Sequence, residues 1–318
     1  MRVNLSTFRL IANPISGKGK GRKFSEIALK KLNTAGLEGE LFLTTGPGHA
    51  NQLAQDAIST GIRWLIACGG DGTIHEIVNA IGRKQDIILG LIPCGKGNDL
   101  ASALRIPKNP IQAIEVLLAQ QTRQTDLGKI GDKFFHTIAT CGYDAEVGRR
   151  VTEEGSILSG TLAYIQKAIT TLPKFESPEA RIEGDFGVFE GKILLTSVGI
   201  TSSYGGGMKI LPDAILDDGL FDVCIIKPIP NLTILRMLAT LYWGGHTNHP
   251  DVQIHRTRTL SLETNPPLKL YADGELIGPV PTKIEMIDQH ITIVVPKPTE
   301  NLSCTTRAWC LDKSTSKT

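Results

Sequence analysis

Several features that would each point to one class of protein are missing from this sequence. No apolar run approaches the roughly 20 residues that a membrane-spanning helix needs, so we expect no transmembrane segment. Phe8–Ala12 is too short for the apolar core of a signal peptide, and it runs directly into Asn13 and Pro14. The net charge is only +2 at pH 7, and no zinc-finger or RNP-like spacing occurs, so we expect no nucleic-acid partner.

The cysteines lack a pattern as well. Six of them are scattered through the chain, at positions 68, 94, 141, 224, 304 and 310, and no two form a C-x-x-C pair. Most have apolar neighbours, which favours reduced, buried thiols in a reducing cytoplasm.

What the sequence does contain is typical of a globular protein with two domains. Hydrophobic residues make up 41% and charged residues 21% of the 318 positions. The first half alternates short apolar runs with amphipathic segments, which predicts a parallel sheet covered by helices on both faces. The expected strands are Phe8–Ala12, Gly39–Thr44, Trp64–Cys68 and Ile87–Ile92, and the expected helices are Phe24–Ala35, Ala50–Ser59, a segment through Ile74, Ile77, Val78 and Ile81, Leu100–Leu104 and Ile111–Ala119.

From about Asp126 the sequence changes to short β-rich segments bounded by turns, which predicts an all-β sandwich or barrel. We therefore divide the chain into an α/β domain, residues 1–125, and a β domain, residues 126–295. Two helical segments are expected within the β domain, Leu158–Thr171 and Leu232–Trp243. The expected strands are Thr125–Ile130, Lys133–Ala139, Ala180–Ile182, Phe189–Ile200, Phe221–Ile226, Thr259–Leu262, Leu268–Ala272 and Ile291–Val295.

The second of these helices has two interpretations. Leu232, Leu235, Leu238, Ala239 and Tyr242 share one face of it. That face could rest on a membrane surface or pack on the sandwich, and we favour packing on the sandwich.

The stretch that organises the first half is Gly69–Thr73, GGDGT, which separates an apolar strand from a helix. Backbone N–H groups at the start of a helix form an anion site, and glycines let a phosphate approach the backbone closely. The carboxylate of Asp71 would repel a phosphate, so its presence suggests a divalent cation between them. The alternative is a glycine-rich connection in which Asp71 or Thr73 only caps the helix.

Three more polar, glycine-rich loops follow the other predicted strands, and they are Asn13–Gly21, Thr44–Gly48 and Pro93–Asp99. Because the carboxyl ends of parallel strands share one edge of a sheet, we expect all four loops to converge on one ligand. The first loop carries Lys18, Lys20 and Arg22, whose charges suit a polyphosphate. It is not a P-loop, because the Walker spacing is missing.

Acidic residues at three further places could hold a cation or accept a proton. Asp99 either caps the helix that follows it or belongs to a metal network. The turn Leu216–Leu220, LDDGL, is either a tight turn or a place where a carboxylate and carbonyls surround a hard cation. The turn Ala272–Glu275, ADGE, is either a hairpin turn or a pair of carboxylates, Asp273 and Glu275, that perturb each other's pKa and serve as a base.

The histidines give weaker signals. We expect His75 on the surface of its helix, in preference to a role as a catalytic base. His246 and His249 could suggest zinc, but beside Pro250 they are more typical of a solvated loop.

Together the motifs resemble one known family. GGDGT after a strand, NPISGKGKG, IPCGKGNDLA and ADGE are similar, in order and spacing, to the bacterial soluble lipid kinases of the diacylglycerol kinase catalytic-domain family. The resemblance extends from Asn13 to Glu275 and into the closing strands. It implies an α/β nucleotide domain related to NAD kinase and 6-phosphofructokinase, a C-terminal β-sandwich and ATP between them. It also implies that the final segment, about residues 296–318, returns to the first domain.

The resemblance implies catalytic roles for five acidic residues. Glu275 is expected to be the general base, assisted by Asp273. Asp71, Asp99 and Asp126 are expected to form an acidic network with Asp273 that holds Mg2+ directly or through water. Because this acidic set is complete, we expect an active kinase.

The resemblance also implies binding residues. A separate, structural Mg2+ is expected at the carboxylate of Asp218 and the carbonyls of Ile215 and Leu220. ATP is expected to contact Asn13, Pro14, Ser16, Gly17, Thr44, Gly69, Gly70, Asp71, Gly72, Thr73, Ile74, His75, Lys96 and Asn98. Two of these depart from the family's usual pattern, since Lys96 replaces a Thr and His75 replaces an Asn.

The expected activity is the ATP- and Mg2+-dependent phosphorylation of the hydroxyl of diacylglycerol or a related lipid alcohol, giving phosphatidic acid or an analogous phospholipid. The expected partners are a lipid substrate and, transiently, the inner face of a membrane, with the protein otherwise in the cytoplasm; a homodimer is one option for its assembly. The alternatives are an NAD kinase or other small-molecule kinase on the same scaffold, and a non-catalytic lipid-binding or regulatory protein.

Overall fold

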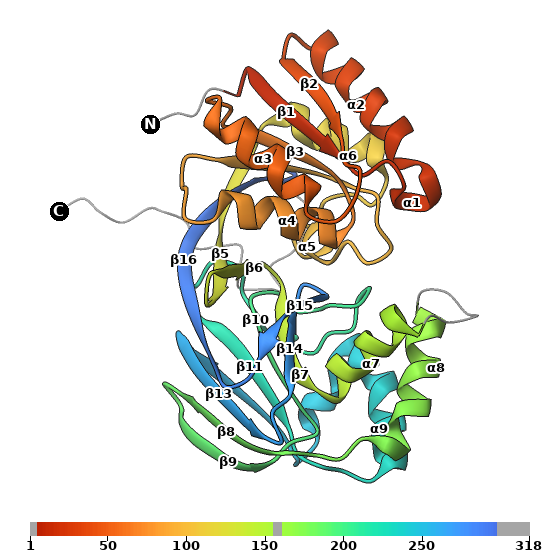
Figure 1. Ribbon diagram of the computed structural model, residues 1–318, viewed down its shortest axis with the longest axis vertical. Helices are drawn as coiled ribbons and strands as arrows, with labels where there is room; N and C mark the ends of the chain where they lie inside the picture. The colour runs from red at the N-terminus through yellow and green to blue at the C-terminus, as the bar shows by residue number, and fades with distance from the viewer. Residues whose placement is uncertain (1–4, 155–160, 298–318) are drawn as a thin grey trace, which may run out of the picture.

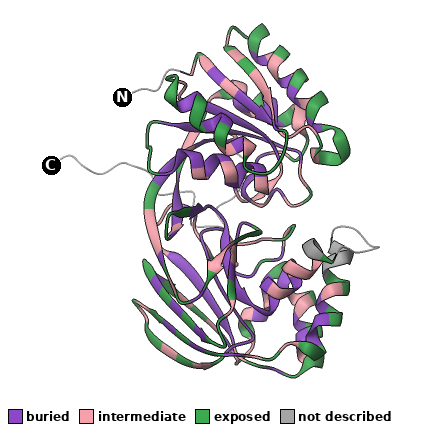
Figure 2. Ribbon diagram, in the orientation of Figure 1, coloured by how far each residue is buried: buried purple, intermediate pink, exposed green. Residues whose placement is uncertain are grey.

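The structure is a computed structural model, and it describes residues 5–154 and 161–297. It has two lobes, which lie one above the other in Figure 1. Strands and the inner faces of helices are mostly buried, whereas exposed residues gather on the outer faces of helices and in loops (Figure 2).

The upper lobe is the predicted parallel sheet, with strand order β2-β1-β3-β4. Helices α2 and α6 pack on one face around Trp64, and helices α3 and α4 pack on the other face around Leu65. The strands β3 and β4 are buried along their whole length because both faces of the sheet are covered. The elements are β1 (Thr7–Ala12), α1 (Ser16–Gly19), α2 (Gly21–Thr34), β2 (Glu38–Leu43), α3 (His49–Ser59), β3 (Trp64–Gly69), α4 (Asp71–Ile81), β4 (Ile88–Pro93), α5 (Asp99–Ala103) and α6 (Pro110–Ala119).

The lower lobe is a sandwich of antiparallel strands. One layer belongs to a sheet that continues into the upper lobe, and the other is a six-stranded sheet in the order β12-β11-β10-β7-β14-β15. The core lies between the layers, where the rings of Phe135 and Phe221 stack with centroids 5.8 Å apart. The strands are β5 (Thr122–Ile130), β6 (Lys133–Phe135), β7 (Ile138–Gly142), β8 (Glu179–Gly184), β9 (Gly187–Lys192), β10 (Leu195–Gly199), β11 (Phe221–Ile226), β12 (Val252–Thr257), β13 (Thr259–Asn265), β14 (Lys269–Ala272), β15 (Glu275–Pro279) and β16 (Thr282–Val294).

One strand, β16, joins the two lobes. Near its end Thr292 pairs in parallel with Ile88 of β4, whereas its first residues pair antiparallel with β13. It also pairs antiparallel with β5, with an irregularity between Ile287 and Ile291. The result is a ten-stranded sheet shared by both lobes, and β16 runs from the lower to the upper lobe in Figure 1. The predicted strand Ile291–Val295 is therefore only the end of a much longer strand.

Helices cover the outer face of the six-stranded sheet. Tyr143, Ala168 and Met237 from three of them pack against sheet residues such as Ile226 in a second core. In Figure 1 these helices stand beside the lower lobe, on the right. They are α7 (Tyr143–Glu153), α8 (Thr161–Thr171) and α9 (Asn231–Thr240), accompanied by the 3₁₀ turns η1 (Leu172–Lys174), η2 (Leu241–Trp243) and η3 (Gly245–Asn248).

Several predicted elements of the second half need correction. Lys133–Ala139 is divided between β6 and β7, and Phe189–Ile200 between β9 and β10, because two residues outside any strand separate each pair. The sequence did not predict α7, β12 or β15. The first residues of the helix predicted at 158–171 lie outside the described residues, as do most of the segment 296–318 and the cysteines at 304 and 310.

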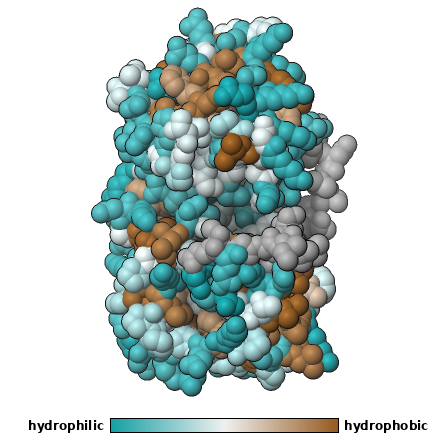
Figure 3. All heavy atoms as spheres, turned by 45° about the vertical axis from the view of Figure 1, so that its right-hand side comes forward, coloured by the Kyte–Doolittle hydropathy of each residue, from teal (hydrophilic) through white to brown (hydrophobic). Residues whose placement is uncertain are grey.

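The apolar face predicted for α9 is not the face that meets the core. Ile234 and Met237 are buried, whereas Leu232 and Leu235 are exposed. Trp243, which follows the helix, is 65% exposed. The helix thus packs on the lower lobe, as favoured, and leaves other apolar side chains outside. Figure 3 shows patches of hydrophobic side chains on the upper, middle and lower parts of one face. Among residues 5–154 and 161–297, none of the helices has the length and apolar character that crossing a bilayer requires.

Two smaller predictions can be compared with the structure. His246 is buried, with its Nε2 3.0 Å from the carbonyl oxygen of Ile210, so the solvated loop predicted for it is wrong. The prediction of free, buried thiols is confirmed for the four cysteines at 68, 94, 141 and 224.

Candidate active site

Glycine-rich loops of the upper lobe meet at the carboxyl edge of its sheet. A Cβ atom at Gly17 would lie 2.9 Å from the carbonyl oxygen of Cys94, and a Cβ atom at Gly95 would lie 2.5 Å from the Cα of Gly70. The loops after β1, β3 and β4 are therefore packed backbone against backbone, which a side chain would prevent. Thr44, buried at the end of β2, starts the fourth loop.

The residues that the sequence assigned to ATP lie in these four loops. Asn13, Pro14, Ser16 and Gly17 follow β1, Thr44 follows β2, Gly69, Gly70, Asp71, Gly72, Thr73, Ile74 and His75 end β3 and begin α4, and Lys96 and Asn98 precede α5.

Asp71, the first residue of α4, holds the loop before α5. Its Oδ2 accepts a hydrogen bond from the Asn98 N–H at 2.8 Å, and its Oδ1 accepts one from the Asp99 N–H at 2.7 Å. Asn98 has a φ of 55°, and its side chain bonds to both the N–H and the carbonyl of Gly95. Asp71 therefore binds the start of the neighbouring helix, and the alternative in which it caps its own helix is wrong.

Asp99 reaches the lower lobe instead of capping α5. Its two oxygens accept hydrogen bonds from the N–H groups of Gly205 and Gly206, in the loop after β10, at 2.8 and 3.0 Å. A Cβ atom at Gly97 would lie 2.7 Å from Oδ2 of Asp71 and 3.5 Å from Oδ2 of Asp99, so the two carboxylates flank that glycine. Burial, and then the charge of Asp71, raises the pKa of Asp99 to about 6. The pair concentrates negative charge that a cation would offset.

The ADGE turn is a two-residue hairpin between β14 and β15, in which Ala272 pairs with Glu275. Asp273 and Gly274 have φ values of 53° and 84°, as the common type I′ hairpin turn requires. The hairpin approaches α4, because a Cβ atom at Gly72 would lie 3.1 Å from Oε1 of Glu275. The lower lobe therefore brings a carboxylate next to the glycine turn of the upper lobe.

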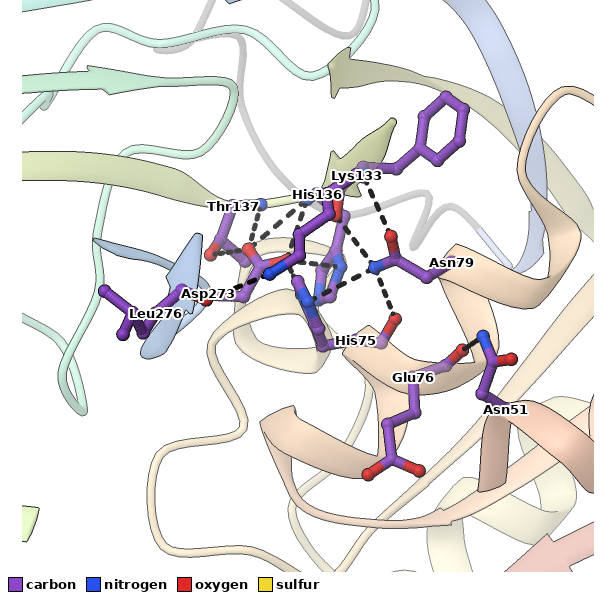
Figure 4. Close-up of polar contacts among 10 residues, drawn as sticks. Asn51, His75, Glu76, Asn79, Lys133, His136, Thr137, Asp273 and Leu276 are labelled. Atoms are coloured by element: carbon purple, nitrogen blue, oxygen red, sulfur yellow. Dashed lines mark hydrogen bonds and ion pairs between the residues drawn. The ribbon is translucent and has the colours of Figure 1, made fainter. Parts of the chain in front are cut away.

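Asp273 is buried, and its carboxylate is surrounded by donors (Figure 4). Oδ1 accepts hydrogen bonds from the N–H of Thr137 at 2.9 Å and from its hydroxyl at 2.6 Å. Oδ2 lies 2.9 Å from Nδ1 of His75 and 3.0 Å from Nδ1 of His136. Burial by itself would raise the pKa of Asp273, but the charge of His136, followed by the hydrogen bond and charge of His75, lowers it well below its usual value. The pKa of Asp273 is therefore perturbed by the two histidines, and not by Glu275 as expected.

The sequence missed part of this cluster. His75 was expected on the helix surface, and this is wrong, because the residue is only 8% exposed and faces Asp273 across the lobes. His136 and Thr137 lie between β6 and β7, where no motif marks them. Gly205 and Gly206 belong to a run of three glycines that signals a turn but does not reveal what the turn contacts.

Asp126 makes its contacts elsewhere. It is 1% exposed, and its oxygens accept hydrogen bonds from the N–H groups of Gly219 and Gln289, both at 2.7 Å. Burial raises its pKa to about 6, and the nearby charges of Asp288 and Asp218 add to that effect. The structure thus places Asp126 beside the LDDGL turn and β16, which differs from the single network expected with Asp71, Asp99 and Asp273.

The three residues expected at a structural metal, Ile215, Asp218 and Leu220, lie in the turn before β11. Asp218 forms an ion pair with Arg256, and its Oδ1 accepts a hydrogen bond from the N–H of Leu220 at 3.2 Å. Asp222, on β11, is buried, and one of its oxygens has no hydrogen-bond partner within residues 5–154 and 161–297. Nε of Arg256 lies 3.7 Å from that oxygen, so in this structure Arg256 supplies the positive charge beside Asp218 and Asp222.

Comparisons with known proteins agree with this arrangement. Residues 7–130 match the family described as diacylglycerol kinase catalytic domain, and residues 137–295 match the YegS C-terminal NAD kinase beta sandwich-like domain. A diacylglycerol kinase of Staphylococcus epidermidis is 35% identical over 291 residues, covering 91% of this chain and 92% of the relative. One from Staphylococcus aureus is 35% identical over 290 residues, with the same coverage.

Solved structures share the fold. A diacylglycerol kinase from Bacillus anthracis has a TM-score of 0.77 at 22% identity, covering 93% of this chain and 99% of the other. A yeast NADH kinase solved with NADH has a TM-score of 0.51 at 14% identity, covering 92% of this chain and 84% of the other. The predicted combination of an NAD kinase-like α/β domain and a β-sandwich is therefore confirmed.

Proposed function

This chain belongs to the diacylglycerol kinase catalytic-domain family, and from this premise we propose that it transfers the γ-phosphoryl group of ATP to the hydroxyl of diacylglycerol or a related lipid alcohol. The product would be phosphatidic acid or an analogous phospholipid. That the protein is a kinase with a lipid-directed role follows from the family. ATP, Mg2+ and the particular acceptor are our proposal, supported by the chemistry of the site.

The upper lobe offers a place for the phosphates of ATP. The first turn of α4 presents backbone N–H groups, which bind anions because they lack partners within the helix. The contact between Gly70 and Gly95 brings two loop backbones together at this point, and Lys96 lies in one of these loops. Basic residues of the loop after β1, such as Lys18, are available to a polyphosphate.

Asp71 and Asp99 have the chemistry to hold Mg2+. Their carboxylates flank Gly97, and the pKa of Asp99 is raised to about 6 by burial and by the charge of Asp71. Hard divalent cations prefer such oxygen ligands. Bound Mg2+ would neutralise charge on the phosphoryl oxygens during transfer.

Glu275 is the group that we assign as the general base. Its carboxylate lies beside Gly72, and within the described residues no hydrogen bond occupies it. In the reaction the acceptor hydroxyl oxygen bonds to the γ-phosphorus, the bond to the ADP oxygen breaks, and the hydroxyl proton passes to Glu275. The observation that carries this proposal is the meeting of Glu275 with the GGDGT turn across the two lobes.

The first experiment measures transfer of labelled phosphate from ATP to diacylglycerol in mixed micelles, with Glu275→Gln as the test variant. We expect the variant to lose about 10²- to 10⁴-fold in kcat while binding ATP normally, because only the proton acceptor is removed. Glu263→Gln, which changes an exposed glutamate on β13, is the matched control. Wild-type turnover in the Glu275→Gln enzyme would refute the assignment of the base.

The same assay tests the acceptor. NAD replaces diacylglycerol in a parallel reaction, and phosphorylation of NAD alone would favour the small-molecule kinase. Lack of transfer to any of several lipid alcohols, with lipid binding retained, would favour a regulatory protein.

Three further expectations remain part of the proposal. We place a second Mg2+ at the turn of Ile215, Asp218 and Leu220, near Asp126 and Asp222. We divide the chain functionally at residues 1–125 and 126–295, with β16 as the element common to both lobes. We also propose that the protein works in the cytoplasm, with transient contact to the inner face of the membrane that supplies its lipid, and that a homodimer is one possible assembly.

A further inference from the structure

A buried contact between the lobes centres on the carboxylate of Asp273. His75 comes from α4 of the upper lobe, whereas His136 and Asp273 come from the lower lobe, and all three are buried. Nδ1 of each histidine lies within 3.0 Å of the same oxygen, Oδ2. Figure 4 shows the three side chains pointing toward one another, with Asn79 on the far side of His75.

The orientation of Asn79 is fixed by the backbone. Its Oδ1 accepts a hydrogen bond from the N–H of Phe134 at 2.9 Å, so its Nδ2 must be the atom facing the other way. Nδ2 donates to the carbonyls of Phe134 and His75, each at 2.9 Å. The same nitrogen lies 3.2 Å from Nε2 of His75.

This environment determines which ring nitrogen of His75 donates to Asp273. An N–H at Nε2 would point at the amide donor of Asn79, so the donor is the N–H at Nδ1. Nδ1–H then donates to Oδ2 of Asp273 at 2.9 Å. Nδ1 of His75 is therefore its donor to Asp273, and the ring is oriented from one side by Asn79 and from the other by Asp273.

Two imidazoles and a carboxylate could also suggest a metal site, but the contacts argue against it. A metal on Nδ1 of His75 would require the proton on Nε2, where it would face the donor Nδ2 of Asn79. Oδ1 of Asp273 is already occupied by two donors of Thr137. The cluster is therefore a hydrogen-bonded contact between the lobes.

We propose that His75 is a positioning residue, which together with the backbone N–H of His136 fixes Asp273 and through it the direction of Glu275. The inference rests on the proposed function and deepens it. Asp273 and Glu275 are joined through Gly274 in a tight hairpin, so the Asp273 side chain sets where the hairpin points. With its oxygens engaged by donors, Asp273 anchors the base and does not itself accept the substrate proton.

Two substitutions of His75 distinguish the loss of its hydrogen-bond donor from the loss of its side-chain shape. Asn carries its amide nitrogen on Cγ, at the same branch as Nδ1 of His, whereas Leu has a methyl group there. We expect the kcat of His75→Asn to exceed that of His75→Leu by about 10-fold, because only the amide can still donate to Asp273. We expect His75→Leu to lower kcat about 10- to 100-fold with the Kd for ATP changed less than about 3-fold, because a displacement of about 1 Å costs up to that much in rate.

The matched control is His246→Leu, which removes a different buried histidine of the lower lobe, bonded to a carbonyl at 3.0 Å. It should lower the melting temperature without lowering kcat. If His246→Leu lowers kcat as much as His75→Leu does, the effect is general destabilisation and the proposal is overturned.

A measurement independent of activity completes the test. Nitrogen-15 NMR of the histidine rings in the full, nucleotide-free chain should show His75 with its proton on Nδ1. A proton on Nε2, or stoichiometric zinc binding that His75→Asn abolishes, would overturn the proposal. A wild-type enzyme that phosphorylates no lipid would instead overturn the proposed function, and active wild type with undiminished His75→Leu would overturn the positioning role alone.

Discussion

Adding a single methyl group at Gly95 should weaken ATP binding sharply. The added Cβ atom would lie 2.5 Å from the Cα of Gly70 and 2.9 Å from Oδ1 of Asn98. Carbon atoms in contact are normally separated by about 3.5–4.0 Å, so the loops after β3 and β4 must move apart by about 1 Å. Overpacking of this kind costs about 1–3 kcal/mol.

The effect on binding follows from this strain. If ATP phosphates lie where the two loops meet, binding requires the original separation, and the strain appears in the dissociation constant. About 1–3 kcal/mol corresponds to roughly a 5- to 150-fold increase in Kd. Isothermal titration of Gly95→Ala with ATP and Mg2+ measures the change.

The control for this experiment is Gly148→Ala in α7, where an added Cβ atom would meet no described atom within 4 Å. It should bind ATP as wild type does. A folded Gly95→Ala protein with an unchanged Kd would show that ATP does not lie between these loops, and the reasoning about the glycine contact would be refuted.

Three other predictions follow from single contacts. Burial raises the pKa of Asp144, so the folded state binds its proton more tightly than the unfolded state does. The free energy of unfolding should therefore fall as pH rises above about 4, and urea unfolding of Asp144→Asn should not show this fall. Asn79→Leu leaves the backbone N–H of Phe134 unpaired and should cost about 1–3 kcal/mol in urea unfolding, which an unchanged midpoint would contradict. Trp243→Ser should not lower the melting temperature, because the side chain is 65% exposed, but should weaken flotation with anionic vesicles if this surface meets the membrane.

Much of the upper lobe could be predicted because its signals are local. β3 and β4 are buried along their whole length, so each is a continuous apolar run ended by glycine or proline. The glycine loops that follow could likewise be placed at one edge of the sheet, since parallel strands leave no other arrangement. Boundaries set by such runs differ from the structure by only a residue or two at β1, β3 and β4.

The long strand β16 could not be predicted, because its partners are distant in the chain. Only its last residues, from Ile291, form an apolar run, while Asp288 and Gln289 in its middle resemble a turn. The irregularity against β5 falls at this polar stretch. What makes these residues a strand is pairing with β4, β5 and β13, and no local pattern carries that information.

The candidate site, too, could be predicted only in part. The spacing of Ile74, Ile77 and Ile81 predicted the helix correctly, but His75 was placed on its surface because the sequence does not show that a second lobe covers that side. The carboxylate of Asp273 could be predicted in a hairpin turn. The donors that surround it, from His136 and Thr137, could not, because they come from a segment with no motif of its own.

The carboxylates at the candidate site are held to different degrees, and this difference bears on their roles. Asp71 and Asp99 each accept two backbone N–H groups, and Asp273 accepts donors from Thr137 and His75. Such carboxylates have fixed directions, which suits groups that position a cation or a hairpin. Within the described residues Glu275 has no such hydrogen bond, so its lone pairs are open to a hydroxyl proton. The hydrogen bonds therefore favour Glu275 over Asp273 as the base, although the two residues share one turn.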